Sequence, residues 1–233
     1  LAASTVAPRR QGEIISSSGH MQLGGELMTL RIFRLLKAKI ADRLLCMVRD
    51  GKLTCDPIKR ELETIPQEAR KDGKYETGYL PRVVENENPD MLSSLLRAAL
   101  ELAERVLPTR WADASDNRTA RLQTFYILWQ YAEEAKKKLG SKDPGNKNRT
   151  IDENYTVTGE KVVELISTLF PGVNTTGKSK ELAVNIEPRQ IEKAIDKVVD
   201  DAVRIALGTL EHLKTSGENP QPDKLDWLIL SGQ

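Results

Sequence analysis

The chain has 233 residues, and its 35 Lys and Arg residues almost balance its 34 Asp and Glu residues, leaving a formal net charge of +1. The chain therefore has no excess of positive charge that would favour a nucleic acid or an anionic membrane as a partner. No run of apolar residues approaches the length needed to span a membrane. The two cysteines, Cys46 and Cys55, are too few for a disulfide scaffold, and with two distant histidines they form no zinc-binding pattern. We expect a cytoplasmic protein with a substantial core.

The first predicted elements are a β-hairpin in residues 1–23 and a long helix after it. Strand-forming residues lie on both sides of a polar turn, and the paired glycines Gly24 and Gly25 end the second strand. After these glycines, apolar residues recur on one helical face, which predicts a helix from about Glu26 to about Gly51.

Residues from about 53 to 113 are less regular than the segments on either side. A short helix is predicted after Asp56-Pro57, and a polar stretch follows it. Asn88-Pro89 combines a capping residue with a proline suited to a first helical turn, so we expect a second helix to begin there. We interpret this region as a helical insert outside the core, because its turn-rich composition interrupts elements that would pair without it.

The second half of the chain alternates helices with short strands. The predicted ranges are a helix at 115–139, a loop at 140–150, a helix at 158–169, a strand at 181–188, a helix at 188–212 and a strand at 225–230. This order predicts an α/β fold, locally α+β, with an excess of helix.

Residues 172–179, GVNTTGKS, fit the phosphate-binding loop pattern G-x-x-x-x-G-K-[ST] at every fixed position. In a P-loop hydrolase, a buried strand leads into this loop and a helix starts at its lysine. Here the surrounding pattern predicts a helix before the loop and a strand after it. We therefore interpret the stretch as a polar turn and keep a P-loop NTPase as the third functional hypothesis.

Three other stretches place turn glycines or clustered charge where elements meet. GHMQLGGELM joins a strand to a helix, YAEEAKKKLGS lies on a helix, and WLILSGQ is a buried-type strand that runs into a turn. In this order, together with LAVNIEPRQIEKAIDKVVDDAVRIALGTL, they resemble the ATPase domain of DnaK-type heat-shock chaperones, within the actin and sugar-kinase superfamily. The resemblance covers residues 13–233 apart from the insert. It implies that residues 1–233 form a single lobe of an actin-like ATPase domain, a piece of a larger protein.

The resemblance implies an ATP site that this lobe shares with a second lobe. Glu133, Lys136 and Lys137 would hold the adenine and ribose, although their spacing by itself is typical of a solvated, self-paired helix face. Gly24 and Gly25 would lie near the phosphates. The other implied contacts come from the end of the adenosine helix and the loop under the adenosine, at Gly140, Gly232 and Gln233.

The chain also departs from the family. Leu27 and Thr29 replace acidic residues after the Gly-Gly-Glu motif, Gly140 replaces a serine, and the two phosphate-binding glycine turns and the catalytic residues are absent. We therefore assign no catalytic residue, and we expect ATP with Mg²⁺ to bind fully only in the parent protein. The chain is interpreted as the ATP-binding lobe of a divergent DnaK-like ATPase, inactive on its own. The second hypothesis is a helical protein-interaction module with a protein partner or client and no nucleotide.

Overall fold

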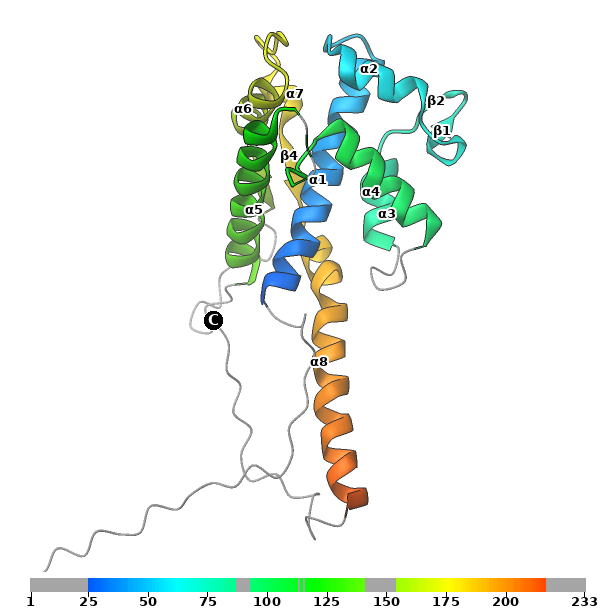
Figure 1. Ribbon diagram of the computed structural model, residues 1–233, viewed down its shortest axis with the longest axis vertical. Helices are drawn as coiled ribbons and strands as arrows, with labels where there is room; N and C mark the ends of the chain where they lie inside the picture. Colours follow the sequence, from blue (N-terminus) through cyan, green and yellow to red (C-terminus); the bar gives the residue numbers. More distant parts are fainter. Residues whose placement is uncertain (1–24, 87–92, 113, 115, 141–153, 217–233) are drawn as a thin grey trace, which may run out of the picture. The chain divides into compact units, whose positions relative to one another are not determined.

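The computed structural model describes residues 25–86, 93–112, 114, 116–140 and 154–216 (Figure 1). The chain divides into two compact units. The first unit is Gly25–Lys197, and the described part of the second is the end of the last helix from Val198 onward. The hairpin predicted in residues 1–23 and the strand predicted at 225–230 lie outside the described residues.

Helices dominate the described residues, and the strands there form two small antiparallel sheets of two strands each, an α+β arrangement. The helices are α1 (Gly25–Arg49), α2 (Asp56–Glu63), α3 (Tyr79–Asn86), α4 (Ser94–Val106), α5 (Arg118–Gly140), α6 (Gly159–Leu169), α7 (Ser179–Leu182) and α8 (Pro188–Ser216), with one 3-10 turn at Gln67–Ala69. The strands are β1 (Arg70–Lys71), β2 (Lys74–Tyr75), β3 (Tyr155–Val157) and β4 (Val184–Ile186).

Helix α1 lies at the centre of the first unit. Figure 1 shows α5 on one side of it and α3 and α4 on the other, and all three pack against it. The sequence predicted one apolar face, but the buried residues of α1 run from Thr29 to Met47 on every face. A helix enclosed by other elements on all sides has this pattern. The predicted range of the helix is confirmed to within two residues at each end.

The interpretation of residues 53–113 as an insert outside the core is wrong. Helices α2, α3 and α4 pack against α1, and their apolar faces belong to the same buried cluster as α1 and α5. Ile58, Leu80 and Leu102, one from each of these helices, are fully buried. Because each helix is amphipathic, the polar composition that suggested an insert belongs to its outward face and to the connections.

A short hairpin and helix α3, neither of them predicted, follow α2. Strands β1 and β2 are joined by Asp72 and Gly73, whose φ angles of 51° and 74° are those of a two-residue hairpin turn with left-handed backbone. The Asp42 carboxylate of α1 accepts hydrogen bonds from the Tyr75 hydroxyl at 2.7 Å and from the Gly78 amide at 2.9 Å. One buried carboxylate therefore positions both the end of the hairpin and the start of α3.

Helices α4 and α5 each begin at a defined residue. Helix α4 begins at Ser94, after Ser93 accepts a hydrogen bond from the Leu96 amide at 3.0 Å, whereas the helix start predicted at Asn88-Pro89 lies outside the described residues. Helix α5 begins at Arg118 instead of near residue 115. The predicted positions of α6 and of the start of α8 are confirmed.

The second sheet joins two segments that α6 and α7 separate. Strand β3 pairs with β4 in antiparallel register, with Tyr155 opposite Ile186 and Val157 opposite Val184. The sequence predicted β4 but not β3, and it placed Leu182 in the strand, whereas Leu182 ends α7. In this sheet, β4 packs against α1 and β3 packs against α5.

Candidate functional site

The start of α1 meets the last turns of α5 in a compact polar cluster, called here the α1–α5 cluster, which consists of Gly25, Thr29, Glu133 and Lys136. Lys136 Nζ donates hydrogen bonds to Thr29 Oγ1 at 2.7 Å, to Glu133 Oε1 at 2.7 Å and to the Gly25 carbonyl oxygen at 3.3 Å. The Thr29 hydroxyl lies 2.9 Å from the same carbonyl and also contacts Glu133 Oε1. One hydrogen-bonded network therefore joins the start of α1 to the end of α5, although the paired residues are separated by 104 to 111 positions in the sequence.

Glu133 and Lys136 form an ion pair at the edge of solvent, with side chains 29% and 25% exposed. Burial raises the pKa of Glu133, but the donors Lys136 and Thr29 outweigh burial and hold that pKa below its ordinary value. The carboxylate is therefore ionised at neutral pH. Its Oε1 atom receives both donors, whereas Oε2 accepts no hydrogen bond from the part of the chain that the structure describes. Among the described residues, this oxygen of Glu133 therefore has no donor.

Three of the residues predicted to contact adenosine or phosphate, Gly25, Glu133 and Lys136, lie in this cluster. Lys137 does not: it is exposed, it makes no hydrogen bond to any described residue, and its charge acts on Glu133 only through space. Gly140 is the last residue of α5. The remaining predicted site residues, Gly24, Gly232 and Gln233, lie outside the described residues.

Thr29 has a role that the sequence did not predict. The sequence resemblance identified Thr29 only as a replacement of an acidic residue, and the structure shows it fully buried between α1 and α5. Its hydroxyl links the first turn of α1 to the carboxylate of Glu133. A hydroxyl on a predicted buried helix face, four residues after a turn glycine, is the signal that could have found it, because buried hydroxyls require hydrogen-bond partners.

The loop of residues 172–179 lies between α6 and the single turn α7, and β4 follows. The predicted flanks, a helix before the loop and a strand after it, are confirmed, with α7 as an addition. Gly172 and Gly177 adopt left-handed turn conformations with φ of 91° and 72°. Since a helix rather than a strand enters the loop, this stretch has the geometry of a polar turn and lacks the strand, loop and helix order of a P-loop.

Close packing between α6 and α7 fixes the end of this loop. A Cβ atom on Gly159 would lie 1.4 Å from the Ser179 carbonyl oxygen and 2.2 Å from its carbon, so the two segments approach this closely only because residue 159 is glycine. Ser179, the residue that would hold magnesium in a P-loop, therefore packs by its backbone against α6.

Within the described ranges, no group of three or more His, Cys, Asp or Glu side chains is placed to hold a metal ion, and no helix there is long and apolar enough to cross a membrane. Comparison of the chain with models of known protein families, with characterised proteins and with solved structures gave no match in any of the three. The α1–α5 cluster is therefore the observation that best supports a functional proposal.

Proposed function

We propose that the chain is the ATP-binding lobe of a DnaK-like ATPase and that it contacts the adenosine of ATP through the α1–α5 cluster. The supporting observation is the hydrogen bond of 3.3 Å from Lys136 Nζ to the Gly25 carbonyl, which joins two segments that the sequence resemblance assigned to one ligand. If Glu133 and Lys136 only formed a solvated, self-paired face of α5, Lys136 would not need a hydrogen bond to the start of α1.

Each residue of the cluster has a distinct part in this proposal. The Oε2 atom of Glu133 accepts a hydrogen bond from a ribose hydroxyl, while Oε1 stays bound to Thr29 and Lys136. The aliphatic stems of Lys136 and Lys137 pack on the adenine face, and their ammonium groups remain in water. Gly25 is exposed and lacks a side chain, so the ligand can approach the backbone at the start of α1.

Phosphoryl transfer also needs Mg²⁺, contacts to the phosphates and a positioned water. The sequence lacks the two phosphate-binding glycine turns of the family, and the described residues contain no cluster of metal ligands. We assign these functions to a second lobe in a longer protein. The present chain then binds ATP weakly and does not hydrolyse it. The contacts of one lobe alone must offset the whole loss of translational and rotational entropy on binding.

Titration of adenosine and of ATP into the ¹⁵N-labelled chain, followed by amide chemical shifts, tests the proposal. We expect weak binding, with the largest shifts at Gly25, Thr29 and residues 133–137, and similar shifts from both ligands because the phosphates make no contact. Glu133→Gln keeps an acceptor for Thr29 but loses the charge, and it should reduce the shifts. The matched control is Glu63→Gln, whose side chain is exposed on α2.

Three results would contradict the proposal. Shifts centred on residues 172–179 would restore the P-loop hypothesis, and the absence of any shift at millimolar adenosine would remove the nucleotide altogether. Equal shifts in the wild type and in Glu133→Gln would mean that the carboxylate does not contact the ribose.

A second candidate function is a protein-interaction module without a nucleotide. On the end of α8, Val199, Val203 and Leu207 are 45%, 53% and 55% exposed, and they recur every four residues along one face of the helix. An exposed apolar stripe of this kind favours a protein partner or client. The titration separates the two candidates, because only the first predicts a response of the α1–α5 cluster to adenosine.

A further inference from the structure

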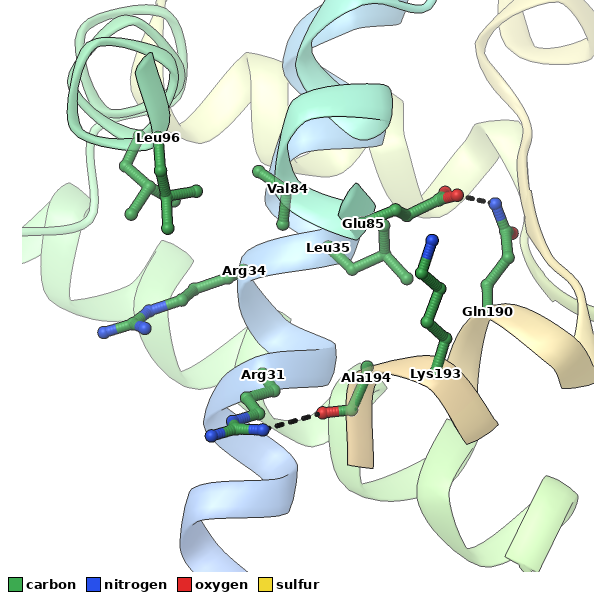
Figure 2. Close-up of a pocket in the computed structure, with 10 residues that line it drawn as sticks. Arg31, Arg34, Leu35, Val84, Glu85, Leu96, Gln190, Lys193 and Ala194 are labelled. Carbon is green, nitrogen blue, oxygen red and sulfur yellow. Dashed lines mark hydrogen bonds between the residues drawn. The ribbon is translucent and has the colours of Figure 1, made fainter. Parts of the chain in front are cut away.

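A small cavity opens between α1, α3, α4 and the first turns of α8, all within the first unit (Figure 2). Its volume is about 60 Å³. One water molecule needs roughly 10–15 Å³ measured in this way, so the cavity has room for a carboxylate and a few carbon atoms but not for a nucleotide. Leu96 and Leu100 of α4 give it an apolar wall.

Charged side chains from three helices line this cavity. Arg31 and Arg34 reach it from α1 and Lys193 from α8, and among the described lining residues Glu85 of α3 is the one carboxylate. Glu85 already accepts a hydrogen bond from Gln190, and Lys193 Nζ donates to Asn86 Oδ1 at 2.6 Å. Arg31 Nη1 donates to the Ala194 carbonyl oxygen at 3.5 Å, so Glu85, Lys193 and Arg31 all have partners at this half-enclosed space.

Arg34 is a lining cation that has no described partner. Its guanidinium is half-buried, and no described residue accepts a hydrogen bond from it or forms an ion pair with it. Burial, and next to it the positive charge of Arg31, lower the pKa of Arg34. A partly desolvated cation beside another cation is costly unless an anion compensates it.

We propose that this cavity binds a small organic carboxylate with a short branched or linear apolar stem, and that Arg34 is its main charge partner. The planar fork of a guanidinium matches the two oxygens of a carboxylate better than a lysine ammonium does. The wall formed by Leu96 and Leu100 accommodates the stem. This site is separate from the α1–α5 cluster, and it does not depend on nucleotide binding.

Isovalerate is a suitable probe, and its uncharged isostere isovaleramide is the control ligand. We expect millimolar isovalerate to raise the thermal unfolding midpoint of the full chain and to shift the side-chain Nε–H resonance of Arg34, and we expect isovaleramide to do neither. Inorganic phosphate, which has the charge but no apolar stem, should bind more weakly than isovalerate.

Three variants make the test specific. Arg34→Gln should weaken isovalerate at least about tenfold, because a charge-assisted hydrogen-bond partner is lost. Arg34→Lys keeps the charge without the fork and should bind with intermediate affinity. Arg43→Gln removes an exposed arginine from the same helix and should bind isovalerate as the wild type does. Equal responses to the acid and the amide, unchanged binding by Arg34→Gln, or no response to isovalerate would each overturn the proposal.

Discussion

Replacement of Glu104 by Gln tests how the buried charges at the centre of the first unit are balanced. Lys37 of α1 and Glu104 of α4 form an ion pair whose side chains are only 8% and 13% exposed. Lys37 Nζ also donates to Thr109 Oγ1 at 2.6 Å, and Glu104 Oε1 accepts from the backbone amides of Thr109 at 2.9 Å and Arg110 at 2.8 Å. These contacts tie the connection after α4 to the middle of α1.

The ionisation of this pair determines how much the substitution costs. Burial lowers the pKa of Lys37 to about 8 despite the attraction of Glu104. Burial also opposes ionisation of Glu104, but Lys37 and the two amides outweigh it and hold the pKa of Glu104 below its ordinary value. Both groups are therefore charged at pH 7. In the wild type at pH 7, a pKa near 8 places the neutral form of Lys37 roughly 1 kcal/mol above the charged form. In Glu104→Gln the attraction is lost, and Lys37 can release its proton at about that cost.

We expect Glu104→Gln to lower the free energy of unfolding by about 2 kcal/mol, because the loss of a charged hydrogen bond adds to the cost of deprotonating Lys37. The double variant Lys37→Met with Glu104→Gln removes both charges, keeps an acceptor for the amides and should return close to the wild type. Urea unfolding followed by circular dichroism measures each value.

The matched control is Glu101→Gln, which breaks an exposed pair with Arg110 and should cost less than about 1 kcal/mol. If Glu104→Gln costs no more than this control, or if the double variant is as unstable as the single one, then Glu104 does not offset a buried charge on Lys37.

Three further changes have definite expected outcomes. Gly159→Ala should lower the free energy of unfolding by about 3 kcal/mol, because the new methyl group meets the Ser179 carbonyl; a loss below about 1 kcal/mol in urea would mean that α7 can move aside. Between pH about 8 and about 10, Lys37 is protonated in the unfolded chain and loses its proton in the folded chain, so stability should rise with pH there. In Lys37→Met, the free energy of unfolding, measured by urea unfolding at each pH, should rise less between pH about 8 and about 10. Replacement of residues 53–113 by a Gly/Ser linker should abolish folding, and dispersed amide resonances from such a variant would contradict the shared core.

The elements that could be predicted from the sequence are those whose signal is local. Helices α1, α5, α6 and α8 are long, and each carries a sustained apolar period or a clear cap, so their positions were predicted to within a few residues. The hairpin β1–β2 and helix α3 were missed because their anchor, Asp42, lies 33 residues before Tyr75 in another helix. Such tertiary hydrogen bonds leave no periodic pattern in the segment that they organise.

In the candidate site too, local features could be predicted from the sequence and tertiary contacts could not. The spacing predicted that Glu133, Lys136 and Lys137 lie within one helical turn, and the resemblance assigned them and Gly25 to one ligand, but the contact of Lys136 with Gly25 was not predicted, since no local pattern links positions 111 residues apart. Thr29 was identified in the sequence only as a departure from the family. Its burial and its contact with Glu133 depend on the packing of α1 against α5, which the sequence did not specify.

The central position of α1 has a consequence for how the chain is made. Helix α1 ends at Arg49 and α5 ends at Gly140, so 91 residues are synthesised between the end of α1 and the completion of α5, the last of the long helices that cover it. At about 5–20 residues per second, the apolar face that α5 will cover is exposed on the ribosome for roughly 5–20 seconds. An unfinished chain in that interval is open to aggregation and to capture by other proteins. Slower translation across this stretch lengthens the time for which that face of α1 is uncovered.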